Sequence, residues 1–212
     1  MTSGANHKKK LVGDRWEVIE PYVSGKRVLD LGCVDHKAMK EKGEKWLHKK
    51  VRNVAGELLG VDYQQSEVDA LNAMGYRVVL GNVEQLNLGE QFDVVLAGNI
   101  IEHLSNPGMF LEAAKRHLRP DSIFILTTDN CFGLRSLRAM MTNDQIRPNE
   151  EHVLTFEEAV LRQLFERHGF KILDFYYYNG PYHDKFKGWV INTLCKIRKS
   201  FAWQMLVVAQ KT

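Results

Sequence analysis

Acidic and glycine residues end two segments of the sequence that are typical of buried β-strands. Asp30 and Gly32 lie at the end of the run Lys26–Leu31, and Asp62 ends the run Glu57–Asp62. In an open α/β sheet, ligands bind beyond the carboxyl ends of the strands. A glycine there lets a ligand approach the backbone, and an acid after the second strand accepts hydrogen bonds from both ribose hydroxyls. The pattern predicts a nucleoside-binding crevice, with the alternative that Asp62 only caps a helix.

Two further polar segments follow the next predicted strands. The run Tyr76–Leu80 is followed by a glycine and Asn82, and the run Phe92–Ala97 leads to Asn99. A glycine followed by a short amide presents a backbone N–H and a side-chain amide to a purine edge. Tyr63 stands beside the acid that ends the second strand, where an aromatic ring can pack on an adenine face.

In order and spacing, these segments resemble the class I methyltransferases that use S-adenosylmethionine. The chain is most similar to the small-molecule group with the pattern VLDLGCG, GVD, FDVV and EHL, segments that begin here at Val28, Gly60, Phe92 and Glu102. The resemblance extends over roughly residues 25–130, with a looser continuation to Gly169. It implies S-adenosylmethionine as cofactor and transfer of a methyl group to an O, N or C atom of a small-molecule acceptor.

The resemblance also implies a contact with the cofactor for each of eight residues. These contacts are Asp30, Gly32 and Cys33 with the methionine part, Asp62 with the ribose, Tyr63 with the adenine face, Asn82 and Val83 with the adenine edge, and Asn99 beneath the methionine part.

The glycine turn after the first strand departs from the family pattern. The family carries Gly-x-Gly-x-Gly, and here Val34 and His36 stand at the second and third glycine positions. One alternative is therefore a module that binds S-adenosylmethionine without catalysing transfer. A nicotinamide-dependent dehydrogenase would instead require Gly-x-Gly-x-x-Gly, which the segment 32–37 lacks.

His103 and His152 are the candidate catalytic residues. Methyl transfer depends mainly on the positioning of the acceptor, and a base is needed only where the acceptor must lose a proton. Histidine titrates in the useful range, and His103 follows the fourth strand closely enough to face the donor. His152 falls in a segment where such folds carry acceptor-covering loops. The alternative for His103 is packing beside Glu102 at the start of a helix.

The remaining pattern alternates strands with helices, which indicates a doubly wound, mainly parallel α/β sheet. Helical spacing from Leu11 predicts a first helix, Asn106-Pro107 a helix start, and Thr155-x-x-Glu158 a capping box. The resemblance implies seven strands in the order 3-2-1-4-5-7-6, with strand 7 antiparallel and helices on both faces. We expect one domain over residues 1–212, with the cofactor-binding core at about 25–130 and acceptor-side loops at about 130–200.

Two basic segments lie in the acceptor-side part. Arg135, Arg138 and Arg147 suit an acidic or phosphorylated acceptor, or a solvated face. Residues 182–200 place apolar side chains at helical spacing among lysines and arginines. Such a helix lies on an anionic membrane surface, covers an acceptor pocket, or packs on the core.

The overall composition is that of an ordinary globular protein. The chain has 212 residues, 44% of them hydrophobic, and a net charge of +3, which is too small to indicate nucleic-acid binding. Its three cysteines are far apart, so we expect reduced thiols in a cytoplasmic protein and no metal site. Weak similarity of the stretch 46–48 and of the region around His152 suggests an acceptor from saccharide or lipid-carrier pathways.

Overall fold

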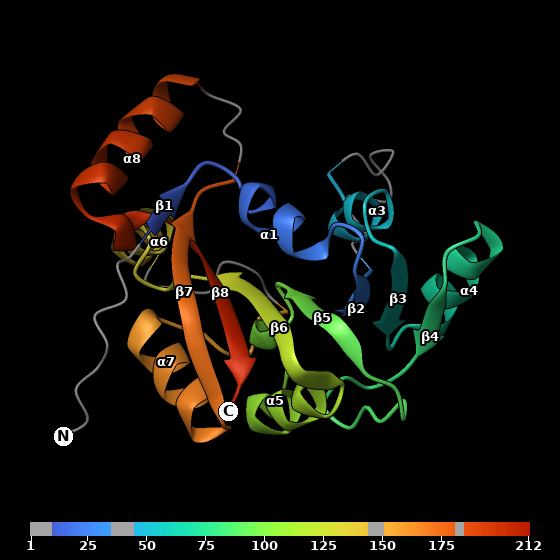
Figure 1. Ribbon diagram of the computed structural model, residues 1–212. Helices are drawn as coiled ribbons and strands as arrows, with labels where there is room; N and C mark the ends of the chain where they lie inside the picture. Colours follow the sequence, from blue (N-terminus) through green and yellow to red (C-terminus); the bar gives the residue numbers. More distant parts are fainter. Residues whose placement is uncertain (1–9, 35–44, 144–150, 181–184) are drawn as a thin grey trace.

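An eight-stranded sheet forms the centre of the computed structural model, which describes residues 10–34, 45–143, 151–180 and 185–212. The strand order is β1-β7-β8-β6-β5-β2-β3-β4 (Figure 1). The strands are β1 (Lys10–Val12), β2 (Arg27–Leu31), β3 (Glu57–Asp62), β4 (Val78–Leu80), β5 (Phe92–Gly98), β6 (Leu118–Asp129), β7 (Phe170–Tyr178) and β8 (Gln204–Lys211).

Seven of these strands follow the predicted order. From β4 to β7 the sheet reads third, second, first, fourth, fifth, seventh and sixth when β1 is left out of the count. β8 is antiparallel to both β6 and β7, and the other neighbouring pairs are parallel. The predicted doubly wound sheet is therefore confirmed, with one strand added at its edge.

The added strand, β1, replaces the start of the first predicted helix. Leu11 pairs with Tyr177 of β7, and the Lys10 ammonium binds the Asp174 carboxylate at 2.6 Å. The helix begins only at Trp16, because Gly13 and Asp14 separate it from the strand. The predicted start of this helix at Leu11 was wrong: Leu11 and Val12 pair with an available sheet edge, and the later part of the apolar pattern forms the helix.

Helices cover both faces of the sheet. They are α1 (Trp16–Val23), α3 (Leu47–Arg52), α4 (Gln65–Ala73), α5 (Pro107–Arg116), α6 (Leu134–Asn143), α7 (Glu158–Arg167) and α8 (Lys185–Ile197), with the short 3₁₀ helices η1 (Ile101–His103) and η2 (Lys199–Phe201). Apolar residues of α5 and α7 pack in one core cluster, whereas those of α1 and α3 pack in another. Figure 1 shows α5 and α7 below the sheet and α1 and α3 above it.

The local sequence determines where α5 starts but not where α7 starts. The Asn106 side chain accepts a hydrogen bond from the Met109 N–H at 3.0 Å, with Pro107 at the first position, as predicted. The predicted capping box at Thr155 is wrong, because α7 begins at Glu158 with Glu157 as its cap. Phe156 is held extended by its bridge to Asn130, so the helix starts later.

The centre of the sheet generates a stability prediction. Leu96 on β5 is fully buried, and we expect Leu96→Ala to lower the free energy of unfolding by about 2–5 kcal/mol, through lost burial and the cavity left behind. Urea denaturation measures this loss. Leu80→Ala is the matched control because Leu80 is 51% exposed, and it should change stability by less than about 1 kcal/mol. Equal losses in the two variants would contradict the assignment of Leu96 to the core.

Candidate active site

The carboxyl ends of four neighbouring parallel strands form one edge of the sheet. Leu31 at the end of β2 pairs with Val61 of β3 and Ala97 of β5, and Asp62 at the end of β3 pairs with Leu80 of β4. The loops after these strands therefore lie side by side. The structure brings Gly32, Asp62, Asn82 and Asn99 to this edge, as the sequence indicated; their contacts with a cofactor remain a prediction.

The turn after β2 is fixed by hydrogen bonds to β3. Gly32 has a φ of 70°, and its N–H donates to the Val61 carbonyl at 2.9 Å. The Asp62 carboxylate accepts the Val34 N–H at 3.1 Å and the Gln64 N–H at 3.2 Å. Gln64, rather than Asp62, occupies the cap position of α4. Asp62 thus ties two loops of the edge together, which differs from the alternative of a simple helix cap.

Asp30 and Cys33 are enclosed by α3 and the residue before it. The Asp30 carboxylate lies 2.8 Å from Nδ1 of His48, and both side chains are buried. The Trp46 indole N–H donates to the Cys33 carbonyl at 2.7 Å. Burial, with the charges of Asp30 and Asp62, raises the pKa of the Cys33 thiol, which makes it a poor nucleophile. The contact of His48 with Asp30 was not predicted, because a histidine in a helical apolar stripe gives no sign of a buried carboxylate partner.

The predicted adenine contacts differ in exposure. Tyr63 is 72% exposed at the rim of the edge. The Asn82 side chain accepts the Glu84 N–H at 2.9 Å, and Val83 is buried in the core. Val83 therefore offers its backbone rather than its side chain to a ligand.

Asn99 connects the edge formed by the carboxyl ends of β4, β3, β2 and β5, called the donor edge below, to the candidate catalytic residues. With a φ of 53°, it is the one non-glycine of positive φ in the described part of the chain, a conformation that asparagine tolerates. Its amide oxygen accepts hydrogen bonds from Arg15 and Thr127, each at 3.0 Å. Its amide nitrogen donates to Oε1 of Glu102 at 3.1 Å. The contact with Arg15 was not predicted, because Arg15 lies 84 residues away in the sequence and belongs to no motif.

Glu102 lies at the centre of this network and is almost fully buried. Its second carboxylate oxygen accepts the Thr128 hydroxyl at 2.9 Å. Burial, helped by the charge of Asp129, raises the pKa of Glu102 to about 7. The Glu102 carbonyl accepts the N–H groups of Val153 and Leu154, which holds the segment after residue 150 against η1.

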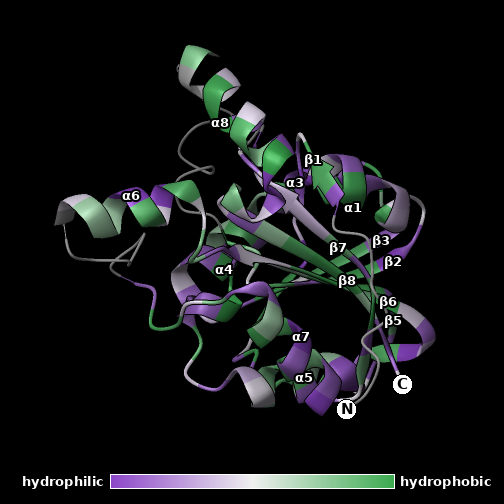
Figure 2. Ribbon diagram, turned by 90° about the vertical axis from the view of Figure 1, so that its left-hand side faces the viewer, coloured by the Kyte–Doolittle hydropathy of each residue, from purple (hydrophilic) through white to green (hydrophobic). Residues whose placement is uncertain are grey.

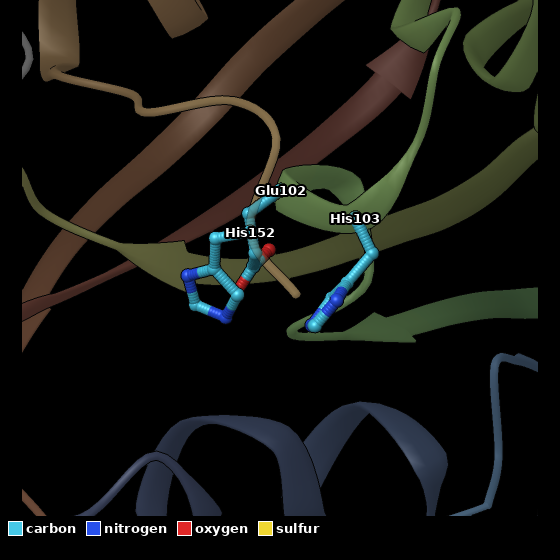
Figure 3. Close-up of side chains that lie close together, drawn as sticks. All are labelled: Glu102, His103 and His152. Atoms are coloured by element: carbon cyan, nitrogen blue, oxygen red, sulfur yellow. The ribbon is translucent and has the colours of Figure 1, made fainter. Parts of the chain in front are cut away.

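This pairing brings His103 and His152 together. Their ring centroids are 4.6 Å apart in an edge-to-face arrangement, and Figure 3 shows both rings beside Glu102. His152 is buried, and burial lowers its pKa although Asp129 acts in the opposite direction. A space of about 10 Å³, enough for one water molecule, lies between Glu102, His152 and Asp129. The structure thus places both candidate catalytic histidines at the edge that carries Asn99.

The arginines considered as contacts for an acidic acceptor lie in different environments. Arg135 lies over the Trp203 ring at 4.7 Å, Arg138 is exposed, and Arg147 and His36 lie outside the described residues.

A larger cavity of about 500 Å³ opens near the amino ends of β2 and β5. Its arginines are engaged with neighbouring side chains and carbonyls, for example Arg27 with Glu57, and it lies at the opposite edge from Asn99. We therefore do not place the site there.

Comparison with known proteins identifies the family. A model described as "Methyltransferase domain" matches residues 14–174, and the chain belongs to this family. A probable S-adenosylmethionine-dependent methyltransferase of Mycolicibacterium smegmatis is 30% identical over 155 residues, covering 71% of this chain and 54% of that protein. A ubiquinone biosynthesis O-methyltransferase of Bradyrhizobium diazoefficiens is 30% identical over 116 residues, covering 51% of this chain and 42% of that protein. The chain thus spans about half the length of these curated relatives.

Solved structures show the same fold. An S-adenosylmethionine-dependent methyltransferase from Archaeoglobus fulgidus aligns with a TM-score of 0.63 at 17% identity, covering 93% of this chain and 91% of that one. A second from Mesorhizobium loti aligns with a TM-score of 0.62 at 15% identity, covering 92% and 95%. The predicted fold and family are confirmed, and S-adenosylmethionine is the methyl donor that these proteins' names give.

The turn after β2 generates a prediction with a matched pair of variants. A Cβ on Gly32 would lie 2.1 Å from Cδ1 of Ile100, whereas a Cβ on Gly25 would meet nothing within 4 Å. Both glycines have a φ near 70°. We expect Gly25→Ala to cost about 1–2 kcal/mol from backbone strain alone. Gly32→Ala should cost at least about 1 kcal/mol more because of overpacking, as measured by urea denaturation. A smaller loss at Gly32 than at Gly25 would contradict the close packing of this turn on Ile100.

Proposed function

We propose that this chain transfers a methyl group from S-adenosylmethionine to a hydroxyl oxygen of a small-molecule acceptor. The observation that carries the proposal is the convergence of Gly32, Asp62 and Asn99 on one edge of the sheet. Next to this edge lie two histidines suited to an acceptor. The relatives named as ubiquinone biosynthesis O-methyltransferases favour oxygen as the methylated atom. A lipid-linked intermediate is the acceptor that the sequence resemblance suggested. Saccharide hydroxyls would present the same reacting group.

The residues at this edge fit the cofactor. An ionised carboxylate has about four acceptor positions, and Asp62 uses two of them for the Val34 and Gln64 N–H groups. The remaining lone pairs suit two ribose hydroxyls. Val34 does not have a positive φ, so its backbone does not require the glycine of the family pattern. This argues against a loss of catalysis through the substitution at Val34, whereas His36, the second substituted position behind the alternative of an inactive module, lies outside the described residues.

The chain's own residues have distinct parts in the proposed reaction. When bound, the cofactor supplies an electrophilic methyl group on sulfur. Asp62 would hold the ribose of the bound cofactor, and Asn99 would contact its methionine part. His103 and His152 contact the acceptor hydroxyl, and an imidazole there takes its proton as the oxygen attacks. Enclosure by the segment around His152 keeps bulk water from the reacting atoms.

The helix α8 suits an anionic membrane surface as the place where a lipid-linked acceptor is met. Phe186, Trp189 and Ile197 recur on one helical face and are 65–80% exposed, while Cys195 on the opposite face is buried. Lys196 is exposed near them. Figures 1 and 2 show α8 projecting from the body of the protein. Within the described residues, no helix has the length and apolar character needed to cross a bilayer.

The ribose contact is tested by Asp62→Ala. Loss of charge-assisted hydrogen bonds worth about 1.5–3 kcal/mol should weaken binding of S-adenosylmethionine and S-adenosylhomocysteine roughly 10- to 100-fold. Isothermal titration calorimetry measures both affinities, and thermal unfolding shows that the variant is folded. Asp69→Ala, on the surface of α4, is the control and should bind like the wild type. Unchanged affinity in Asp62→Ala would show that the ribose lies elsewhere.

The membrane surface is tested by sedimentation with lipid vesicles. The wild-type chain should sediment with vesicles containing phosphatidylglycerol and much less with pure phosphatidylcholine. The double variant Phe186→Ser and Trp189→Ser should lose most of this binding, because both exposed rings are removed. Met74→Ser removes a 57% exposed apolar side chain just after α4, away from α8, and should sediment like the wild type. No binding by the wild type, or no loss in the double variant, would refute this surface.

A further inference from the structure

Glu102, His103 and His152 form a cluster of three groups that are each able to bind a metal ion. One ligand atom from each side chain lies within 4.8 Å of the other two. In Figure 3 the three side chains converge from η1 and from the segment that carries His152. Residues that are 50 positions apart in the sequence therefore present two imidazoles and one carboxylate to a single point.

The carboxylate of this cluster is held in place by hydrogen bonds that leave it able to bind an ion. Asn99 donates to one of its oxygens at 3.1 Å, and the Thr128 hydroxyl donates to the other at 2.9 Å. Nδ1 of His152 lies 3.8 Å from the Asp129 carboxylate. Metal ligands are commonly oriented by a second layer of polar groups, and here the two donors behind Glu102 are hydrogen-bonded to it, whereas Asp129 lies near His152 without a hydrogen bond.

The cluster is also largely buried. Glu102 is 1% exposed and His152 is 7% exposed. Within the described ranges, no lysine or arginine forms an ion pair with Glu102. A divalent ion bound by the same three side chains would therefore meet no competing cationic side chain there.

We propose that Glu102, His103 and His152 bind a divalent transition-metal ion beside the donor edge. Two imidazoles and one carboxylate suit zinc, cobalt or ferrous ions better than magnesium, which prefers oxygen ligands. Three protein ligands leave open coordination positions, as catalytic sites do. Ligand distances of about 2.0–2.2 Å place the ligand atoms of a tetrahedral site roughly 3.4 Å apart. Rotation of the histidine side chains closes the difference from the arrangement without the ion.

A bound ion would select acceptors whose hydroxyl group can coordinate it. This inference about the acceptor rests on the proposed function. An acceptor hydroxyl, particularly one with a neighbouring oxygen, would occupy the open positions and lose its proton to water. An oxygen lone pair then forms the bond to the methyl carbon. The carbon–sulfur bond breaks, and its electron pair stays on sulfur to give S-adenosylhomocysteine. In this arrangement both imidazoles are ligands, and water takes the place of the imidazole base of the proposed function, while the methyl donor and the reacting hydroxyl stay the same.

Metal binding is tested directly on the full chain without a histidine tag. After treatment with a chelator, titration with Zn²⁺ or Co²⁺ should show one ion per chain by calorimetry, and Co²⁺ should give a visible absorption band. Mg²⁺ should bind at least tenfold more weakly. The variants His152→Ala and Glu102→Gln should each lose affinity for Zn²⁺ by more than tenfold and lose the Co²⁺ band. Absence of binding by the wild type would overturn the proposal.

One control variant and one further test variant make this result specific. His168 lies 2.9 Å from the Glu112 carboxylate, and among the described residues no third metal-binding group joins these two, so His168→Ala should bind the ions like the wild type. His103→Asn changes a less buried member of the cluster and should also lose binding, even where a variant at a more buried position fails to fold. Equal loss in His168→Ala would overturn the proposed ligands.

Binding of S-adenosylhomocysteine is measured on the same samples and separates this proposal from the proposed function. If metal-free protein still binds S-adenosylhomocysteine and still transfers methyl groups, the proposed metal ion has no part in the reaction and the histidines remain candidate bases. If the wild type does not bind S-adenosylhomocysteine, the proposed function is wrong, and the metal site is then judged by the Zn²⁺ and Co²⁺ titrations alone.

Discussion

The parallel register of β4, β3, β2 and β5 is the constraint on which the site depends. Parallel strands end at the same edge, so four loops that are far apart in the sequence must meet there. The Asp62 carboxylate strengthens this arrangement because it accepts N–H groups from the loop after β2 and from its own loop. The same side chain that we assign to the ribose therefore also sets the spacing of the loops around it.

Asn99 extends this organisation from the donor edge to the acceptor side. Its amide accepts from Arg15 and Thr127 and donates to Glu102, which in turn holds the segment carrying His152 through backbone hydrogen bonds. Both sides of the reaction centre are thus joined by one continuous set of polar contacts. A movement of Asn99 would change the position of the carboxylate and, through it, that of His152.

Sequence alone was sufficient where a segment carried its own signal. The bounds of β3 were predicted as Glu57–Asp62, because an apolar run closed by an acid marks both ends of a buried strand. The start of α7 was missed, because the bridge between Phe156 and Asn130 depends on a partner that is distant in the sequence. The same reason explains the absence of His48 from the candidate residues, since its partner Asp30 is reached only through packing of α3 on the sheet. Local patterns predict elements and the order of the loops, whereas pairings between elements need the fold.

The edge strand β1 bears on the order in which the sheet assembles. Its residue Lys10 contacts Tyr176 across 166 positions of sequence, and its partner β7 is held in turn by β8 near the end of the chain. Such a distant contact carries a large loop-closure entropy, which is repaid only after the intervening strands are in place. β1 is therefore expected to join last during folding and to open first under mild destabilisation. Its detachment would expose the unpaired backbone groups of β7, which is the usual starting point for association between sheet edges.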